Sequence, residues 1–379
     1  MSPHSINQED EIKRIFAQIG GISLHKDFTE PIMSELYIQQ QKQQPVKHNH
    51  LSGIKNRHKT WLLASLSTAA GIILITSLFT SSSMAASLQQ IPVLQSIFQL
   101  AGDLGLYRAA NENLSDHPNA VASIGDITVT VPEVVYDGNR VSLSLIRTAA
   151  GSSASMSLRD QISNIDIWVD GINVQASDSG NSVPIFSFPG ADDNSAIIEF
   201  ADLSNQGGEP FPDQFDLTLH LSMNGFKDPL SLSVPVTITS GDHIEIKPSI
   251  SKDYGNLTFR LKKIELTPIT TNITTAISLP EELVYDQAAN GIAFDVLDEK
   301  GNKLQTLTGN GYNEAGSNTF VSDMRYHPFP EIPEKIILRP YKYIYSDSTH
   351  TTFAQDEEGN IIVEYLPQLD IEISLEDFL

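Results

Sequence analysis

ITVTVPEVVYDGNRVSLSL, residues 127–145, is the stretch of the chain that decides its fold. In Ile127–Val131 and again in Val141–Leu145, apolar side chains alternate with Thr or Ser, which is the period of a strand with one buried face. Between the two runs lies Asp137-Gly138, a residue pair that favours a tight turn. The stretch therefore predicts a β-hairpin.

Similar alternating runs recur toward the C-terminus without long helical patterns between them, which favours β-sandwiches over α/β architectures. They are Asn164–Val174, Ser195–Phe200, Phe215–Ser222, Leu230–Ile238, Leu257–Leu266, Asn272–Leu279, Gly291–Leu297, Lys303–Thr308, Lys335–Tyr345 and Ile361–Tyr365. A faint internal repeat relates the run at Ile127 to that at Leu257. We expect a mainly β protein with two tandem antiparallel β-sandwich (Ig-like) domains, residues 121–243 and 244–379, divided near Ser240–Lys247.

Two short helices are expected ahead of the β region, within residues 81–120. The first begins at Pro92 and places Val93, Ile97 and Leu100 on one face, and the second covers Leu106–Asn113. We expect the first helix to pack on the β region or to lie at a membrane surface.

An uncharged segment further upstream predicts the topology. Trp61–Phe79 holds 19 residues that, as a helix, span roughly 28 Å, close to the thickness of a bilayer core. Lys55, Arg57 and Lys59 precede the segment, and Trp61 stands where an interfacial aromatic is favoured. We therefore expect a transmembrane helix at residues 61–80, a single-pass protein of the cell membrane, a cytoplasmic N-terminus and extracellular C-terminal domains.

Two other interpretations of this segment are weaker. Cleavage of a signal peptide after Ser83-Met84-Ala85 would require an amino-terminal region of about 60 residues, far longer than such signals use. A buried core helix does not explain why the segment is apolar on every face and has cations on one side only.

The segment before the span, residues 1–60, predicts a helical tail and a polar tether. A first helix, Asp10–Gly20, and a second that begins near Thr29 each have one apolar face, and two such short helices do not bury these faces well on each other. We therefore expect a partner protein to cover them. The residues concerned are Ile12, Ile15, Phe16 and Ile19 in the first helix and Ile32, Met33 and Leu36 in the second.

Charge and composition exclude several classes of function. Residues 1–60 hold 8 Lys and Arg against 6 Asp and Glu, whereas residues 61–379 hold 16 against 41, a field that disfavours nucleic acid and other polyanions as partners. There is no cysteine, and we find no phosphate loop, HExxH, GxSxG or SxxK motif. Acidic turns at residues 192–194 and 356–360 lack the ligand spacing of a calcium loop. We expect no catalytic residues, no metal and no cofactor, and a protein that is not an enzyme.

The sequence resembles a known family over Ala85–Leu145. AASLQQIPVLQSIFQLAGDLGLY followed by ITVTVPEVVYDGNRVSLSL is similar to the membrane-anchored proteins of the domain-of-unknown-function 4179 family, found mainly in Gram-positive bacteria, and the chain from about Ile244 resembles the 5643-type companion domain. The resemblance implies an anti-sigma factor, because members often accompany extracytoplasmic-function sigma factors. The chain departs from the zinc-containing anti-sigma type, since it has no His-x-x-x-Cys-x-x-Cys.

These features lead to a functional hypothesis with one main rival. In the first, the tail helices sequester an extracytoplasmic-function sigma factor, the exterior domains sense envelope conditions, and proteolysis near Ala70-Gly71 or Ser83 to Ala85 releases the factor. In the rival, the chain is an interaction or structural module of the cell envelope that binds an envelope protein, and its N-terminal part is only an anchor. A hydrolase built from a spatial Ser or Asp cluster is a third class that no motif supports.

Overall fold

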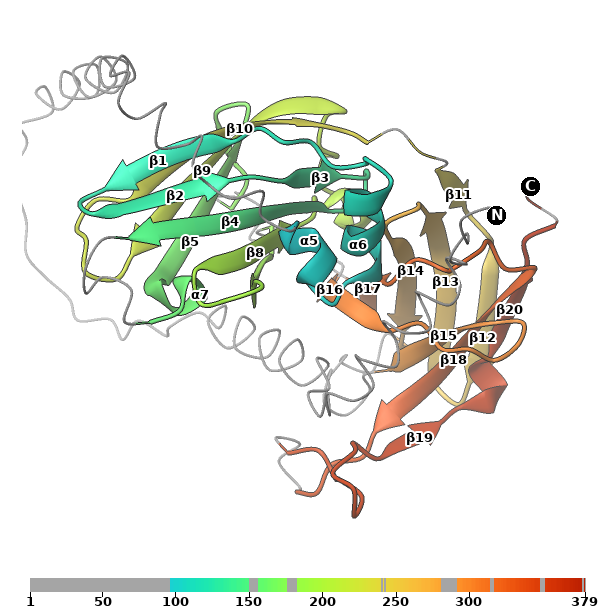
Figure 1. The fold of residues 1–379 in the computed structure, drawn as a ribbon. Helices are drawn as coiled ribbons and strands as arrows, with labels where there is room; N and C mark the ends of the chain where they lie inside the picture. Colours follow the sequence, from blue (N-terminus) through green and yellow to red (C-terminus); the bar gives the residue numbers. More distant parts are fainter. Residues whose placement is uncertain are drawn as a thin grey trace, which may run out of the picture. The chain divides into compact units, whose positions relative to one another are not determined.

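Antiparallel β-strands make up most of the regular structure in the computed structural model of the chain (Figure 1). The model describes residues 96–149, 156–175, 183–239, 241, 243–280, 292–313, 317–347, 352–376 and 378. Within them lie three short α-helices, α5 (Ile97–Leu100), α6 (Leu104–Asn111) and α7 (Leu158–Gln161), and two 3-10 turns, η2 (Ser204–Gln206) and η3 (Pro367–Leu369). The expectation of a mainly β, antiparallel protein with few helices is confirmed.

The first sandwich consists of two sheets that enclose one hydrophobic core. One sheet has the order β1-β2-β4-β8-β7, with β3 also paired to β4, and the other has the order β10-β9-β5-β6. Their bounds are β1 Ala120–Ile124, β2 Ile127–Val131, β3 Val134–Tyr136, β4 Val141–Ala149, β5 Ile162–Val169, β6 Ile172–Asn173, β7 Ile185–Pro189, β8 Ser195–Phe200, β9 Gln214–Met223 and β10 Leu230–Thr237. Alternate residues of facing strands, among them Leu143, Leu219 and Leu232, are buried in the shared core.

The quoted stretch 127–145 forms more than the simple hairpin that its pattern predicts. Pro132 lies between β2 and β3, and both of these short strands pair antiparallel with β4. A proline has no N–H to donate to a ladder, which explains why the strand is interrupted at this point. The turn itself is as expected, because β3 and β4 are joined across Asp137-Gly138 and Gly138 has a φ of +89° that favours glycine.

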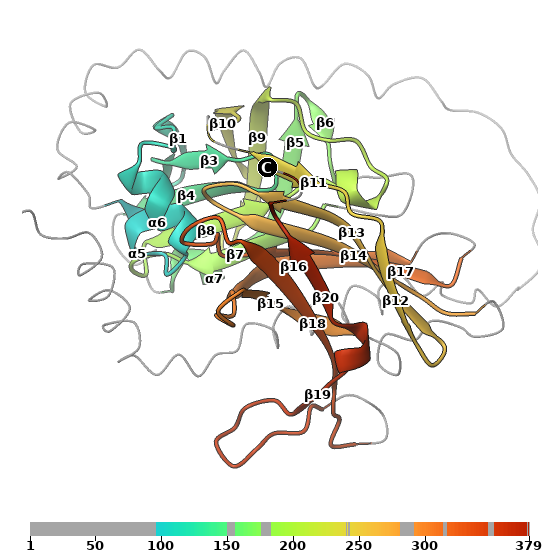
Figure 2. The same ribbon diagram turned by 90° about the vertical axis from the view of Figure 1, so that its right-hand side faces the viewer.

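The second sandwich repeats this plan with its own core. One sheet has the order β11-β13-β14-β17-β16, with β12 also on β13, and the other places β15, β19 and β20 on β18 (Figure 2). The bounds are β11 Ile244–Ile246, β12 Ile250–Tyr254, β13 Leu257–Leu266, β14 Thr271–Ser278, β15 Ala293–Asp298, β16 Thr306–Asn313, β17 Thr319–Tyr326, β18 Lys335–Tyr343, β19 Val363–Tyr365 and β20 Ile371–Ser374. Phe259, Val296 and Leu338 are among the residues that the two sheets bury together.

Several expected strand limits need correction. The run Asn164–Val174 is not one strand, because Asp170 and Gly171 have positive φ and form a turn between β5 and β6. The run Lys303–Thr308 overlaps only the beginning of β16. Strands β1, β7, β11, β12, β17 and β20 were not expected at all, because their sequences are short, contain many polar residues or include proline.

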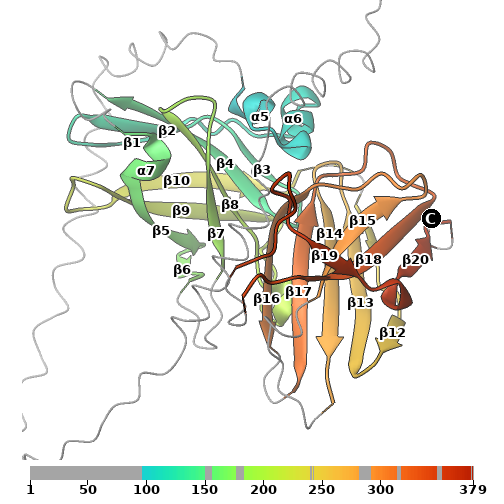
Figure 3. The same cartoon turned by 90° about the horizontal axis from the view of Figure 1, so that it is seen from below.

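The two helices expected before the β region are present but shifted. Helix α5 begins after Ser96, whose side chain accepts a hydrogen bond from the Gln99 N–H, and the expected start at Pro92 lies outside the described residues. Helix α6 begins two residues earlier than expected, after Asp103. Figure 3 shows both helices beside the first sandwich. Phe98 and Leu106 are among the residues that are buried in this contact.

The expected tail and span, residues 1–80, lie outside the described residues. Among the helices that the structure does describe, none is both long enough and apolar enough to cross a bilayer.

Candidate functional site

A buried carboxylate anchors helix α5 to the first sandwich. Glu133 follows Pro132 at the interruption between β2 and β3, and its side chain accepts hydrogen bonds from the Ser96 hydroxyl and from the backbone N–H of Ile97 at 3.0 Å. A carboxylate at this position pairs with the free N–H groups of the first helical turn. The break in the strand thus provides the attachment point for the helix.

Asp103 fixes helix α6 in a similar way and also contacts the sandwich. Its Oδ1 accepts from the backbone N–H groups of Gly105 at 2.7 Å and Leu106 at 3.1 Å, which is N-terminal capping. Its Oδ2 accepts from Nη1 of Arg140 at 2.7 Å. One side chain therefore determines both where the helix begins and where it is attached.

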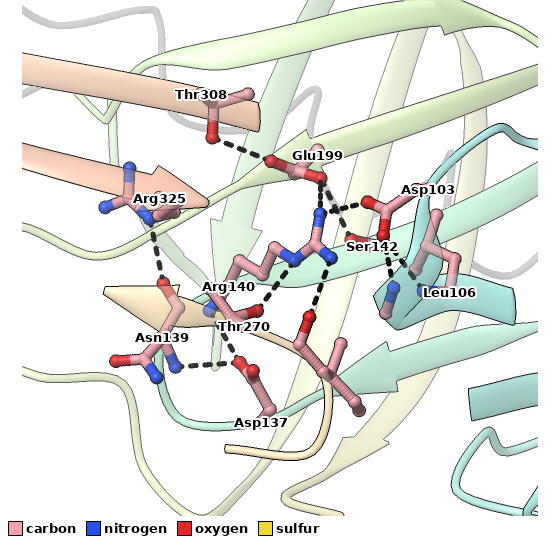
Figure 4. Close-up of polar contacts among 12 residues, drawn as sticks. Asp103, Leu106, Asp137, Asn139, Arg140, Ser142, Glu199, Thr270, Thr308 and Arg325 are labelled. Atoms are coloured by element: carbon pink, nitrogen blue, oxygen red, sulfur yellow. Dashed lines mark hydrogen bonds and ion pairs between the residues drawn. The ribbon is translucent and has the colours of Figure 1, made fainter. Parts of the chain in front are cut away.

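Arg140 is the centre of a junction between three parts of the fold (Figure 4). The residue ends the β3–β4 turn, is 1% exposed, and donates from Nη1 to Asp103 and to Glu199 of β8 at 2.6 Å. It also donates from Nε to the Thr270 hydroxyl at 3.0 Å and from Nη2 to the Ile269 carbonyl at 3.3 Å, both in the β13–β14 connection of the second sandwich. Helix α6 and both sandwiches thus meet on one guanidinium group.

The charges of this junction stabilise one another. Burial alone would lower the pKa of Arg140, but Asp103 and Glu199 more than offset it, so this pKa is raised above its ordinary value. Burial would raise the pKa of Asp103, yet the Arg140 charge and its hydrogen bond keep this pKa below the usual range. Arg140 and Asp103 therefore remain ionised throughout the neutral pH range and do not act as a pH switch there.

A second polar network continues the contact between the sandwiches. Arg325 of β17 pairs with Asp323 at 2.7 Å. It also donates from Nε to the Asn139 carbonyl of the β3–β4 turn at 3.2 Å (Figure 4). From the first sandwich, the Asn205 amide donates to Asp323 at 3.0 Å. These residues lie on the outer face of the sheet that contains β17, where a solvated surface would be the ordinary arrangement.

Glu265 of β13 belongs to the same network, and its pKa lies well below the ordinary value. Burial would raise its pKa, but hydrogen bonding and charge from His243 and Lys263, together with the Asn272 amide, lower the pKa to about 2. Lys263 lies 2.8 Å away and His243 lies 3.7 Å away. The carboxylate therefore stays charged under all ordinary conditions.

A cavity of about 260 Å³ lies beside Arg140, bordered by α6, β8 and β16. Leu106, Phe188 and Ile197 form apolar parts of its wall, and His327 lies on another side, with a pKa that burial lowers. The Glu199 carboxylate in this wall already accepts from Arg140, Ser142 and Thr308, which does not suit it for proton transfer or nucleophilic attack. In the described ranges, no group of three His, Asp or Glu side chains is placed to hold a metal ion.

The site residues expected from sequence all lie outside the described part of the chain, and their roles stay predictions. They are Ile12, Ile15, Phe16, Ile19, Ile32, Met33 and Leu36 of the tail, Lys55, Arg57, Lys59 and Trp61 at the span, and Ala70, Gly71, Ser83 and Ala85 at the proposed cleavage points. Sequence reasoning missed Asp103, Arg140 and Glu199. An aspartate directly before a helical pattern was an available signal for a cap, but nothing in the sequence indicated its ion pair.

Replacing Arg140 should destabilise the protein strongly. Arg140→Ala leaves Asp103 and Glu199 buried without a counter-ion, so we expect the free energy of unfolding to fall by about 3–5 kcal/mol. Lys335→Ala, which removes an exposed ion pair with Glu372, is the control and should change stability little. Urea titration followed by circular dichroism measures both, and equal effects of the two substitutions would contradict the central position of Arg140.

Gly105→Ala tests the close contact between helix α6 and the second sandwich. A β-carbon at Gly105 would collide with the carbonyl group of Ile269. Helix propensity alone would make this substitution stabilising by about 1 kcal/mol, whereas the collision predicts a loss of about 1–3 kcal/mol. The sign of the change in the free energy of unfolding therefore decides whether the contact exists in solution.

The low pKa of Glu265 predicts an acid-dependent loss of stability. An ionised Glu265 stabilises the folded chain fully above its ordinary pKa of 4.5, and this contribution disappears as the pH falls toward the folded value of about 2. Between pH 4.5 and 2, the melting temperature of Glu265→Gln should therefore fall less steeply than that of the wild type. The exposed Glu209→Gln is the matched control, and its curve should run parallel to the wild-type curve.

Comparison with known proteins agrees with the resemblance seen in the sequence. Residues 56–146 match the model of a family described as "Domain of unknown function (DUF4179)", and residues 243–375 match that of a "Family of unknown function (DUF5643)". No curated protein matches the chain.

Among solved structures, the conserved domain protein from Bacillus anthracis is similar in fold. The identity is 14% and the TM-score 0.50, over 75% of this chain and 100% of that one. A marsupial T cell receptor (10% identity, 58% of this chain and 59% of that one) and bovine butyrophilin (7% identity, 64% and 93%) align with TM-scores of only 0.18, too low to carry an argument. The chain therefore contains a DUF4179 domain followed by a DUF5643 domain, and the Bacillus anthracis protein shares its fold.

Proposed function

We propose that this chain is a single-pass membrane regulator, an anti-sigma factor that sequesters an extracytoplasmic-function sigma factor through its cytoplasmic tail. The observation that carries the proposal is the attachment of α5 and α6 to the β domains. Glu133 holds α5, and Asp103 joins α6 to Arg140 and through it to the second sandwich. In the proposed topology these helices are the first described elements that follow the span in the sequence.

This attachment supports a route for an exterior signal. Arg140 and Gly105 both contact the β13–β14 connection of the second sandwich, so a shift of that connection would remove contacts from α6. Loss of these contacts would detach α5 and α6 from the β domains, and the proposed cleavage point at Ser83 and Ala85 precedes α5 in the sequence. The buried junction is thus the element whose state the exterior domains would transmit.

The tail supplies the proposed partner surface. Ile12, Ile15, Phe16 and Ile19 share one face of a predicted helix, and Ile32, Met33 and Leu36 share a face of the next. Apolar helix faces of this kind are suited to a groove on a partner protein. The choice of a sigma factor as the partner rests on the family resemblance, and the binding mode needs no metal because the chain has no cysteine.

Substitution of the tail faces tests the sigma-factor partner. In the full chain, Ile15→Asp with Phe16→Asp should reduce co-purification of the sigma factor encoded beside this gene by at least about tenfold, because two buried apolar side chains become charged. Ala17→Asp introduces one negative charge on the opposite face of the predicted helix and should leave co-purification unchanged. No association of the wild-type chain with that sigma factor would overturn the proposal.

One observation favours the alternative, an interaction module of the cell envelope. The hairpin that continues β18 and β19 extends beyond the sheet (Figures 1 and 2). Along it, the Phe353 ring makes tilted contacts with the rings of Tyr343 and Tyr345, at centroid distances of 4.6 and 5.1 Å. Ile344 and Tyr365 are 40% and 45% exposed in the same region. Exposed apolar and aromatic side chains close together are typical of binding surfaces for proteins.

Deletion of residues 1–50 distinguishes the two functions. The regulator predicts a large increase in transcription of genes that depend on the sigma factor, because the sequestering tail is lost. The envelope module predicts unchanged transcription. RNA sequencing of the deletion strain against a strain carrying Ala17→Asp measures the difference at the same expression level of the protein.

A further inference from the structure

One groove in the described part of the molecule is basic, although the chain as a whole is strongly acidic. It has a volume of about 810 Å³, and Lys247, Arg260, Lys262 and Lys263 all line it, with no acidic residue among its lining side chains. Only 16 Lys and Arg residues follow residue 60, against 41 Asp and Glu. Four of those 16 cations border one groove, which sets this surface apart from the rest of the protein.

A β-bulge in strand β13 produces this concentration of charge. The buried residues of β13 are spaced two apart up to Leu261, but the next buried residue, Ile264, is three positions further on. The pairing of β13 with β14 shifts register between Leu261 and Lys263. Lys262 and Lys263 are therefore both excluded from the core, on the side where Arg260 is exposed, which a regular strand would not allow.

The cations differ in how far they are already neutralised. Lys247 pairs with Glu245 at 2.6 Å, and Lys263 pairs with Glu265 at 2.8 Å. Arg260 is exposed and makes no ion pair with any residue that the structure describes. A guanidinium group in this position offers a planar pair of N–H donors that fits two oxygens of a tetrahedral oxyanion.

Neutral donors surround Arg260. Ser251 lies directly opposite Arg260 in the β12–β13 pair, on the same exposed face, and Ser249 borders the groove beside it. Asn205 reaches the groove from η2 of the first sandwich, and its amide donates to Asp323 at 3.0 Å. A ligand in the groove would thus touch both sandwiches next to the contact that joins them.

We propose that this groove binds a small, soluble ligand that carries a phosphate group, with Arg260 as the main charged contact. Phosphate presents several acceptor oxygens and close to two negative charges at neutral pH, which matches a set of cations and hydroxyl groups. A large polyanion or an anionic membrane would have to approach the acidic surface around the groove and would be repelled. A small anion would lie among the cations of the groove, and salt would screen it from the more distant acidic surface. The inference does not depend on the proposed sigma-factor function.

The test uses inorganic phosphate and the full chain purified in a non-ionic detergent. Isothermal titration calorimetry at constant ionic strength should show saturable binding of phosphate. In Arg260→Gln/Lys262→Gln the affinity should fall by at least about tenfold, because the main charged contact is lost and the groove lining loses a second positive charge. Lys227→Gln/Lys300→Gln removes the same charge from exposed positions outside the groove and should bind as the wild type does.

Further measurements keep the result decisive. Circular dichroism confirms that each variant is folded, and Arg260→Lys, which keeps the charge but loses the planar donor pair, should bind with intermediate affinity. Absence of phosphate binding to the wild type, or an equal loss in both double variants, would overturn the proposal. Binding only to phosphatidylcholine vesicles that contain phosphatidylglycerol, and not to free phosphate, would overturn the assignment of a soluble ligand.

Discussion

The buried Arg140 guanidinium group, held between two carboxylates, is the interaction on which the arrangement of this molecule depends. Taking a charge out of water costs several kcal/mol unless counter-ions and hydrogen bonds replace the lost solvation. At Arg140 these partners come from Asp103 before a helix, from Glu199 in the first sandwich and from Thr270 in the second. These three partners must surround Arg140 together for its charge to be compensated. The junction therefore favours one specific arrangement of the helix and the two sandwiches, and its net contribution to stability is smaller than this effect on specificity.

The apolar contacts around the junction depend on the same arrangement. Ile269 of the second sandwich is fully buried with Leu106 and Phe98 of the helices, and this contact requires that residue 105 have no side chain. Such close packing has few alternatives, because an added methyl group has no space and a displaced helix would uncover the ion pair. Polar and apolar interactions therefore constrain the helices together, and a local change in one of the sandwiches would affect both.

Much of the fold was predictable from the period of its strands, and the errors have physical causes. Leu230–Thr237 alternates perfectly because one of its faces is in the core and the other is exposed, so its pattern is easily recognised. Thr319–Tyr326 was missed because Asp323 and Arg325, which would be solvated in an ordinary sandwich, are buried against the first sandwich. The first sandwich takes the place of water on that face of the strand. The alternation of apolar and polar residues predicts a strand only where its polar face is solvated, so it does not identify this one.

The junction around Arg140 could not be predicted from the sequence, for a related reason. Asp103, Arg140 and Glu199 read as ordinary surface residues when they stand alone, and only long-range pairing makes them a unit. The consecutive lysines 262 and 263 show the same limit, since alternation would send one of them into the core. A register shift places both on the outer face, so charge patterning in this protein depends on strand pairing as much as on composition. The net charge of the chain therefore predicts the electrostatic field of the whole molecule. It does not predict the sign of the potential at the groove, where the β-bulge brings two lysines to the same face.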